Sequence, residues 1–199
     1  MMTDSKKMTI STYNCKHYKD IKVPYMKKLL DDSDIILIQE HCLYEKQLNE
    51  LSKLGDVGYH GVSPMNECIP LVGRPFGGCA IVWRNKLNAK FTPIPTHSNR
   101  LCAGTFQLSS GFDIFILCVY LPCDDRQRGD SYLELIDTLN EMLCLKNGAT
   151  ANAILVAGDL NTDFTRQTPQ VAAVTEFIYL CNRFQAWYKL LKVGCTIYI

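Results

Sequence analysis

The sequence predicts an α/β fold in which two mixed β-sheets pack together and helices cover their outer faces. Apolar runs of strand length alternate with segments of helical periodicity, which is typical of α/β proteins. The middle of the chain, residues 77–120, instead carries several strand-like segments in succession, which argues against a uniform alternation of strands and helices. At 199 residues the chain can bury a substantial core, and we expect a single domain over residues 1–199.

The first part of the chain is predicted to form two strands, each followed by a helix. Residues 8–14 are rich in β-branched and aromatic side chains and indicate a strand. Apolar residues at helical spacing predict a helix over 20–30, and 35–38 is an apolar run typical of a buried strand. Residues 43–54 are interpreted as a helix that a glycine ends. Scattered glycines and prolines predict a loop over 56–74.

The central part of the chain is predicted to contain four strands and the clearest helix. Residues 77–83 form a strand that begins with two glycines, which suit a close approach of the backbone. Three further predicted strands cover residues 90–95, 100–108 and 112–121. Residues 130–146 have an apolar stripe at helical spacing, and Asn147 and Gly148 close this helix.

The last part of the chain begins with a short, fully apolar strand. Residues 154–157 have the length and β-branched content of a strand buried on both faces, and Gly158 is expected to stop it. Residues 171–191 carry a helical pattern. Residues 193–199 are compatible with either a strand or a loose tail.

Composition excludes several function classes. Hydrophobic residues make up 47% of the chain and charged residues 21%, and the formal net charge is only +1, so a nucleic-acid role would need a local basic patch. The ten cysteines form no CxxC pair, and Cys79, Cys102 and Cys118 lie in apolar runs, so we expect free thiols and no disulfide-linked partner. Residues 1–7 do not resemble a secretory signal and no run could span a membrane, which predicts an intracellular protein of nucleus or cytoplasm without a membrane partner.

Polar side chains stand at the ends of several predicted strands. Asn14 and Glu40 follow two of them, Tyr120 lies near the end of a third, and Asp159 and Asn161 follow a fourth. Alternate residues of an extended chain point the same way, so the last two would face one spot, although Asp and Asn beside glycine are also common turn formers. Carboxylate oxygens with amides nearby suit Mg²⁺ or a similar hard cation, which can polarise a phosphoryl oxygen while an aspartate orients water.

Four short motifs in this order resemble the endonuclease/exonuclease/phosphatase superfamily. They are Thr12-Tyr13-Asn14, Ile38-Gln39-Glu40, Val119-Tyr120-Leu121-Pro122 and Gly158-Asp159-Leu160-Asn161. Residues 77–82 and 98–102 also resemble the apurinic-type endonuclease domains of non-LTR, LINE-like retrotransposons, to which the similarity is closest. The resemblance covers residues 8–164 and leaves 184–199 as an atypical tail.

The resemblance implies a four-layered α/β sandwich and DNA hydrolysis that depends on Mg²⁺ or Mn²⁺. By position, Glu40 would be the main metal ligand and Asn14 would assist at the metal or phosphate. Tyr120 would contact the phosphate, Asp159 would position or activate the water, and Asn161 would stabilise the transition state. Arg126 and Arg128 are candidate contacts to the DNA backbone, with a solvated loop neutralised by neighbouring aspartates as the simpler alternative.

The sequence also departs from the family. Members end with a Ser-Asp-His-like motif, whereas His17, His41, His60 and His97 lie in other settings, and His41 and His97 are expected at the surface or in loops. The resemblance therefore suggests a truncated copy that lacks the last strands and has weak or no nuclease activity. The alternatives are a phosphatase or phosphodiesterase of the same superfamily that acts on small phosphate esters, and a non-catalytic remnant.

Overall fold

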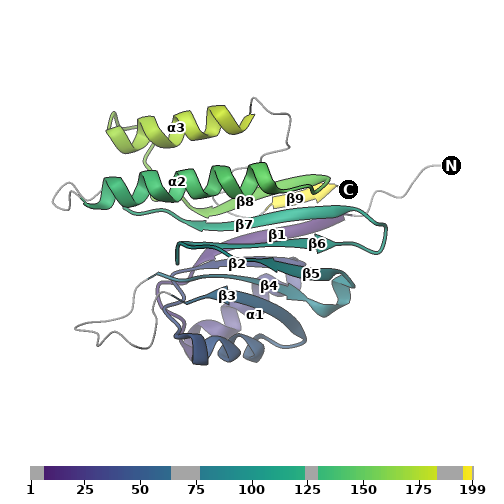
Figure 1. Cartoon of the computed structure of the whole chain (residues 1–199). Helices are drawn as coiled ribbons and strands as arrows, with labels where there is room; N and C mark the ends of the chain where they lie inside the picture. The colour runs from purple at the N-terminus through teal and green to yellow at the C-terminus, as the bar shows by residue number, and fades with distance from the viewer. Residues whose placement is uncertain (1–6, 64–76, 124–129, 183–194, 199) are drawn as a thin grey trace.

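A computed structural model describes residues 7–63, 77–123, 130–182 and 195–198. Two β-sheets lie face to face, one of five strands in the order β3–β4–β2–β1–β9 and one of four in the order β5–β6–β7–β8 (Figure 1). The strands are β1 (Lys7–Asn14), β2 (Ile35–Gln39), β3 (Val57–Val62), β4 (Cys79–Arg84), β5 (Lys90–Ile94), β6 (Leu101–Gln107), β7 (Asp113–Tyr120), β8 (Ala153–Asp159) and β9 (Cys195–Tyr198). The helices are α1 (Val23–Asp32), α2 (Asp130–Gly148) and α3 (Pro169–Asn182), with 3-10 helices η1 (Asp20–Lys22), η2 (Glu45–Leu54) and η3 (Asn85–Leu87).

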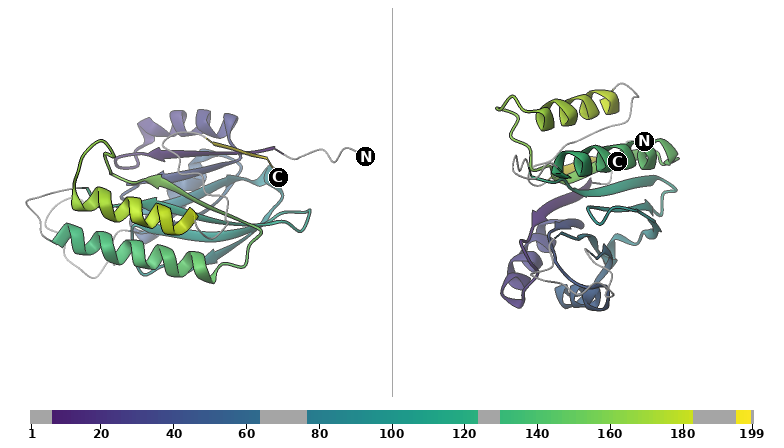
Figure 2. Two further views of the ribbon diagram at one scale, coloured as in Figure 1. Left: turned by 90° about the horizontal axis from the view of Figure 1, so that it is seen from above. Right: turned by 60° about the vertical axis from the view of Figure 1, so that its left-hand side comes forward.

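The helices cover the outer faces of the two sheets, which confirms the predicted α/β sandwich (Figures 1 and 2). On the outer face of the four-stranded sheet, apolar residues of α2 and α3 such as Leu135 and Phe177 pack against Phe115 and Leu117. On the opposite outer face, residues of α1 and η2 pack against β2 and β4. None of the helices in the described part of the chain combines the length and apolarity needed to cross a bilayer.

The core between the sheets is built by alternation along the buried strands. In β2, Ile35 and Leu37 face the other sheet, whereas Ile36 and Ile38 face α1 and η2. Period-two alternation with apolar residues at every position is expected for a strand buried on both sides. The same pattern occurs in β8, which therefore has two buried faces even though it ends the four-stranded sheet in the described structure.

Parallel pairing brings four strand ends to one side of the molecule. β1 and β2 run parallel with Asn14 opposite Gln39, and β7 and β8 run parallel with Tyr120 opposite Asp159. Because the carboxyl ends of parallel strands meet at one edge of a sheet, each sheet presents polar residues at the same end of the sandwich. This edge is the place where the sequence predicts the functional side chains.

Several predicted elements need correction. Residues 56–74 were predicted as a loop, but the strand β3 lies within them. Its glycines suggested a loop, whereas they make room for side chains that pack on the strand: a Cβ on Gly58 would lie 2.3 Å from the Trp83 side chain. The helix predicted over 43–54 is the 3-10 helix η2, and β9 confirms the strand alternative within 193–199. The helix predicted over 171–191 is observed as α3, and its remainder lies outside the described residues.

Gly158 does not stop β8, as the sequence suggested, but lies inside it. The strand continues to Asp159, and Gly158 has φ +152°. A Cβ at this position would lie 1.9 Å from the carbonyl oxygen of Val119 on β7. Glycine is therefore required for the close approach of β8 to β7, which carries Asp159 to the strand end.

Candidate functional site

Asn14 connects two carboxylates that come from different sheets. Its amide nitrogen Nδ2 donates to Glu40 Oε1 and to Asp159 Oδ2, both at 2.7 Å. Asn14 and Glu40 follow neighbouring strands of the five-stranded sheet, whereas Asp159 ends β8 of the other sheet. The predicted residues Asn14, Glu40 and Asp159 thus form one cluster, and their side chains are half-buried.

The backbone around this cluster adopts an uncommon conformation. In the described structure, six residues other than glycine have positive φ, and five of them surround the cluster: Lys16, His17, Glu40, Cys42 and Asn161. At Glu40, φ is +52°, although long side chains rarely adopt left-handed backbone conformations. Such strain of about 1–3 kcal/mol per residue persists where the surrounding structure imposes it, and it concentrates at functional sites.

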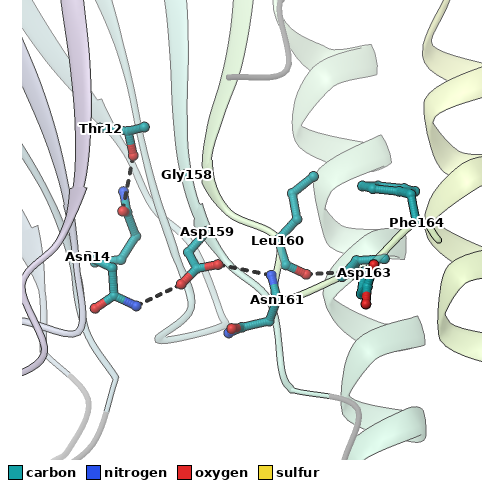
Figure 3. A pocket seen from close by; sticks show the side chains of 10 residues that line it. Thr12, Asn14, Gly158, Asp159, Leu160, Asn161, Asp163 and Phe164 are labelled. Atoms are coloured by element: carbon teal, nitrogen blue, oxygen red, sulfur yellow. Dashed lines mark hydrogen bonds between the residues drawn. The ribbon is translucent and has the colours of Figure 1, made fainter. Parts of the chain in front are cut away.

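Asp159 and Asn161 form a turn and also line one cavity (Figure 3). Asp159 Oδ1 accepts a hydrogen bond from the Asn161 backbone N–H at 3.0 Å, and the Asn161 side-chain amide donates to the Leu121 carbonyl oxygen at 2.7 Å. The two alternatives that the sequence left open, a turn and a pair of functional side chains, are therefore compatible. The cavity is open to solvent and measures about 750 Å³, and Thr12, Gln39 and Phe164 contribute to its lining.

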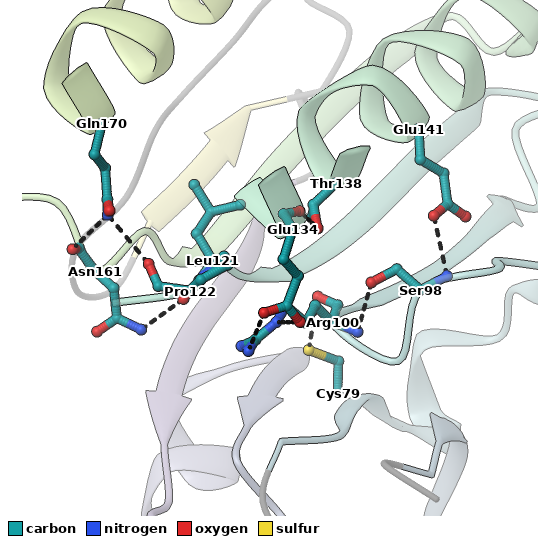
Figure 4. Close-up of polar contacts among 10 residues, drawn as sticks. All are labelled: Cys79, Ser98, Arg100, Leu121, Pro122, Glu134, Thr138, Glu141, Asn161 and Gln170. Carbon is teal, nitrogen blue, oxygen red and sulfur yellow. Dashed lines mark hydrogen bonds and ion pairs between the residues drawn. The ribbon is translucent and has the colours of Figure 1, made fainter. Parts of the chain in front are cut away.

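Tyr120 is buried at the end of β7, next to Glu40 and Arg100. Burial raises the pKa of the Tyr120 phenol, and the Glu40 carboxylate raises it further. The phenol therefore remains protonated near neutral pH and can donate a hydrogen bond. The Arg100 guanidinium lies over the Tyr120 ring, 5.0 Å from its centroid, and forms an ion pair with Glu134 (Figure 4).

The donor set fits a hard divalent cation. Glu40 and Asp159 supply two carboxylates that accept hydrogen bonds from the same Asn14 side-chain NH₂ group, and the Asn161 side-chain amide lies nearby. In the described part of the chain, no three His, Cys, Asp or Glu side chains form a metal cluster. A site with only two carboxylates still suits Mg²⁺, because one or two carboxylates commonly bind this ion while water and substrate phosphate complete its coordination.

None of the four histidines is among the residues that line this cavity, and His41 lies in the loop between β2 and η2, as one of the two expected settings has it. His41 is not at the surface but fully buried: its Nδ1 accepts from the Leu43 N–H, and its Nε2 lies 3.1 Å from the Val62 carbonyl oxygen. Burial lowers the pKa of His41 to about 4, so the ring is neutral and holds the segment after Glu40. Arg126 and Arg128 lie outside the described residues.

The cysteines in the apolar runs have the predicted environment. Cys79, Cys102 and Cys118 are completely buried between the sheets. The eight cysteines whose side chains the structure describes are free thiols.

Sequence reasoning missed several residues that shape the site. Thr12 Oγ1 donates to Gln39 Oε1 at 3.0 Å, so both line the cavity in fixed positions. Gln170, at the start of α3, donates to the carbonyl oxygens of Pro122 and Asn161, both at 3.1 Å. Thr12 and Gln39 stand inside the recognised motifs and could have been identified there, whereas nothing in the sequence pattern indicates Gln170.

Comparisons with known proteins give one family match and several structures of similar fold. A sequence profile described as the endonuclease/exonuclease/phosphatase family matches residues 11–183. No curated protein sequence matches the chain.

Three solved structures have a similar fold. The Neisseria 3′ phosphatase NExo, bound to a product DNA hairpin, has 17% identity and a TM-score of 0.58, with 87% of this chain and 71% of that chain covered. The AP endonuclease LMAP from Leishmania major has 13% identity and a TM-score of 0.62, with coverage of 87% and 66%. The catalytic domain of Xenopus laevis APE2 has 15% identity and a TM-score of 0.59, with coverage of 85% and 67%.

Proposed function

The chain belongs to the endonuclease/exonuclease/phosphatase family, and from this premise we propose that it hydrolyses phosphodiester bonds of DNA with a divalent metal ion. The observation that carries the proposal is the Asn14 amide between the Glu40 and Asp159 carboxylates at the edge of an open cavity. The sequence motifs favour an endonuclease like those of non-LTR retrotransposons.

The residues of the site have complementary roles in this reaction. Glu40 and Asn14 would hold the metal ion, which would supply Lewis-acid polarisation of the phosphate when it is bound. Asp159 orients the attacking water, since each of its oxygens accepts one hydrogen bond from Asn14 or Asn161 and keeps a further lone pair. The protonated Tyr120 phenol donates to the phosphate, and the Asn161 amide stabilises charge that develops on phosphorus.

A basic segment next to the site favours DNA over small phosphate esters. Residues 15–22 contain three lysines against one aspartate, a local excess of two positive charges in a chain whose net charge is +1. The segment begins at the site, because the Lys16 backbone N–H donates to Asn14 Oδ1 at 3.0 Å. Lys16 and Lys19 are exposed, and so is Tyr25 of α1. Lysines that follow a groove supply most of the non-specific affinity for a nucleic-acid backbone.

We expect turnover to be low. Members of the family use the histidine of a Ser-Asp-His-like motif to contact the phosphate, and none of the four histidines of this chain stands in such a motif. Groups that stabilise a transition state commonly contribute a factor of about 100–1,000 each. The site is therefore expected to bind metal and DNA while it cleaves slowly.

The test is the nicking of supercoiled plasmid by the purified chain, with Mg²⁺ and with EDTA. Glu40→Gln is the matched variant, because the amide oxygen can still accept from Asn14 while the metal-binding charge is lost. We expect slow nicking that requires Mg²⁺ and that falls at least about 100-fold in the variant. A p-nitrophenyl phosphate assay runs in parallel.

Two outcomes would contradict the proposal. Nicking that persists in EDTA or in the Glu40 variant would assign the activity to another site or to a contaminant. Hydrolysis of the small ester in the absence of any nicking by a folded monomer would identify a phosphatase instead. A turnover comparable to that of other nucleases of this family would contradict only the expected slow rate.

A further inference from the structure

The turn that precedes β6 is fastened to helix α2 by two carboxylates (Figure 4). Glu141 accepts hydrogen bonds from the backbone N–H groups of His97 and Ser98, at 2.6 and 3.0 Å. Glu134 accepts from Arg100 Nε at 2.5 Å and from its terminal nitrogen at 3.1 Å. The two glutamates lie seven residues apart, and side chains two helical turns apart share one face of a helix.

Arg100 is unusually well fixed for an arginine. The residue is only 8% exposed, and its guanidinium makes the bidentate ion pair with Glu134, which is the most directional pairing available to this side chain. Its carbonyl oxygen accepts from the Tyr120 backbone N–H at 2.9 Å and from the Cys79 thiol at 3.2 Å. Arg100 is thus bound through both its backbone and its side chain.

Arg100 in turn contacts the side chain of Tyr120. The guanidinium covers one face of the Tyr120 ring at 5.0 Å, a distance at which a cation and an aromatic ring attract each other. The ring is also buried, and the Glu40 carboxylate acts on its phenol group. A ring with a guanidinium on its face and a carboxylate near its hydroxyl has little freedom to rotate.

We propose that Arg100, held by Glu134 of α2, is a positioning residue that fixes the Tyr120 ring within the site. Arg100 acts through Tyr120 and does not itself contact substrate, since the carboxylate of Glu134 occupies its fork. Helix α2, which lies on the outer face of the four-stranded sheet, thereby contributes to the position of Tyr120 next to Glu40. The catalytic part of this inference rests on the proposed function, whereas the structural part does not.

The structural part is tested without any activity assay. The full chain is labelled with 3-fluorotyrosine, and Tyr120→Phe identifies the Tyr120 signal in the ¹⁹F NMR spectrum. We expect Arg100→Ala and Glu134→Gln to move this signal. Arg84→Ala is the control, because the Arg84 guanidinium is also held by hydrogen bonds, to the Leu30 and Asp31 carbonyl oxygens, but lies at the far end of the five-stranded sheet.

The catalytic part is tested by nicking kinetics with Mg²⁺. Arg100→Ala is expected to lower kcat by about 10- to 100-fold with little change in KM, because misplacement of a contact group impairs chemistry more than binding. Added guanidinium at millimolar concentration should restore part of the rate by filling the space between Tyr120 and Glu134. Equal concentrations of NaCl should not, and Arg84→Ala should show neither the loss nor the rescue.

Each result has a distinct meaning. If the Tyr120 signal stays in place in both Arg100→Ala and Glu134→Gln, the proposal is wrong whatever the activity. If the wild-type chain does not nick DNA, the proposed function fails, and the fluorine spectra still decide whether Arg100 positions Tyr120. If Arg100→Ala does not fold, Glu134→Gln carries the test, because Glu134 is 48% exposed at its side chain and can be changed without opening the core. A wild-type rate in a variant with a shifted Tyr120 signal would overturn the catalytic part.

Discussion

Position 158 requires glycine because the backbones of β8 and β7 lie very close together there. The site for its missing Cβ lies 1.9 Å from the Val119 carbonyl oxygen and 2.8 Å from the Val119 nitrogen. A backbone atom cannot move aside as the end of a flexible side chain can. Any side chain at this position must therefore push β8 away from β7, one residue before Asp159.

Gly158→Ala is expected to lower the free energy of unfolding by about 3 kcal/mol or more, because it combines a backbone clash with a left-handed φ. Urea unfolding followed by circular dichroism measures the change. Gly148→Ala is the matched control, since a Cβ there meets no atom within 4 Å, and its effect should stay within about 1 kcal/mol. Equal stability of the two variants would contradict the close approach of β8 to β7.

His41 links folding to pH. Its pKa is about 4 in the folded chain because the ring is buried, whereas an exposed histidine has a pKa of about 6.5. Between these values the unfolded chain binds a proton that the folded chain does not. Stability is therefore complete above pH 6.5 and falls as the pH drops toward 4, with a total loss of about 3 kcal/mol from this residue.

His41→Gln should remove this part of the pH dependence. Urea unfolding of both proteins between pH 4 and 7, with EDTA present, gives the difference in stability at each pH. The advantage of wild type over the variant should shrink as the pH falls. A constant difference across this range would mean that His41 is not a neutral buried residue.

Residue identities were predictable where the chemistry is confined to strand ends. Asn14, Glu40 and Asp159 stand directly after apolar runs, and the structure brings all three together. The burial of His41 was not predictable, because it depends on the Val62 carbonyl oxygen, which lies 21 residues away. Contacts across such separations leave no local pattern in a single sequence.

At the scale of elements, an aromatic cluster connects three strands of both sheets. Phe106 of β6 packs against Trp83 of β4 and Phe91 of β5, with ring centroids 5.3 and 4.8 Å apart. Phe106 pairs with Ile114, at the opposite end of the sheet from Tyr120. The cluster therefore stabilises the sandwich at a distance from the functional site.

Phe106→Ala is expected to destabilise the chain by about 3–5 kcal/mol, the usual cost when a buried aromatic side chain is removed. Phe106→Leu, which keeps most of the apolar volume, should cost clearly less. Chemical unfolding measures both. Binding of Mg²⁺, followed by calorimetry below the unfolding transition, should remain unchanged in each variant, and a loss of binding would show that the cluster and the site are coupled.

The elements themselves were predictable to different extents. Strands buried on both faces, such as β2 and β7, can be recognised in the sequence as unbroken apolar runs. The strand β3 does not, because Gly58 and Gly61 occupy positions where Trp83 and Leu48 pack over the backbone. In this strand glycine marks close packing, and local propensity alone assigns it to a loop.

At the scale of the whole molecule, charge is distributed unevenly around a nearly neutral chain. Lys16 lies beside the cavity, where its backbone N–H donates to Asn14, and Lys22 donates to the Lys16 carbonyl oxygen, whereas Lys86 and Lys90 lie at the other end of the sheets. The association of DNA with the site should therefore depend on salt through a small set of lysines.

Replacement of Lys16 and Lys19 by alanine is expected to weaken DNA binding and to reduce the slope of log affinity against log salt by about 1 per lysine. Fluorescence anisotropy with a labelled duplex in EDTA gives both quantities without cleavage. The paired control changes Lys86 and Lys90 to alanine, so both double variants have the same net charge. Equal slopes for the two double variants would show that binding follows net charge and not the basic segment.

The fold class was predictable because the order of elements already limits how the sheets can be arranged. Consecutive strands after residue 77 require antiparallel neighbours, and the observed pairs β5–β6 and β6–β7 are antiparallel. The pairing of β9 with β1 could not be predicted, because it joins the two ends of the described chain.

The single amide of Asn14 has a consequence for how this protein tolerates change. It binds one carboxylate at the end of each sheet, so under the proposed function the rate of cleavage depends on the distance between the sheets. A core substitution that shifts one sheet slightly relative to the other can leave the chain folded and still break one of the two hydrogen bonds of Asn14. A mutational screen for solubility would not detect such variants. A screen for DNA cleavage would detect them, and the sensitive positions would include residues of the core between the sheets.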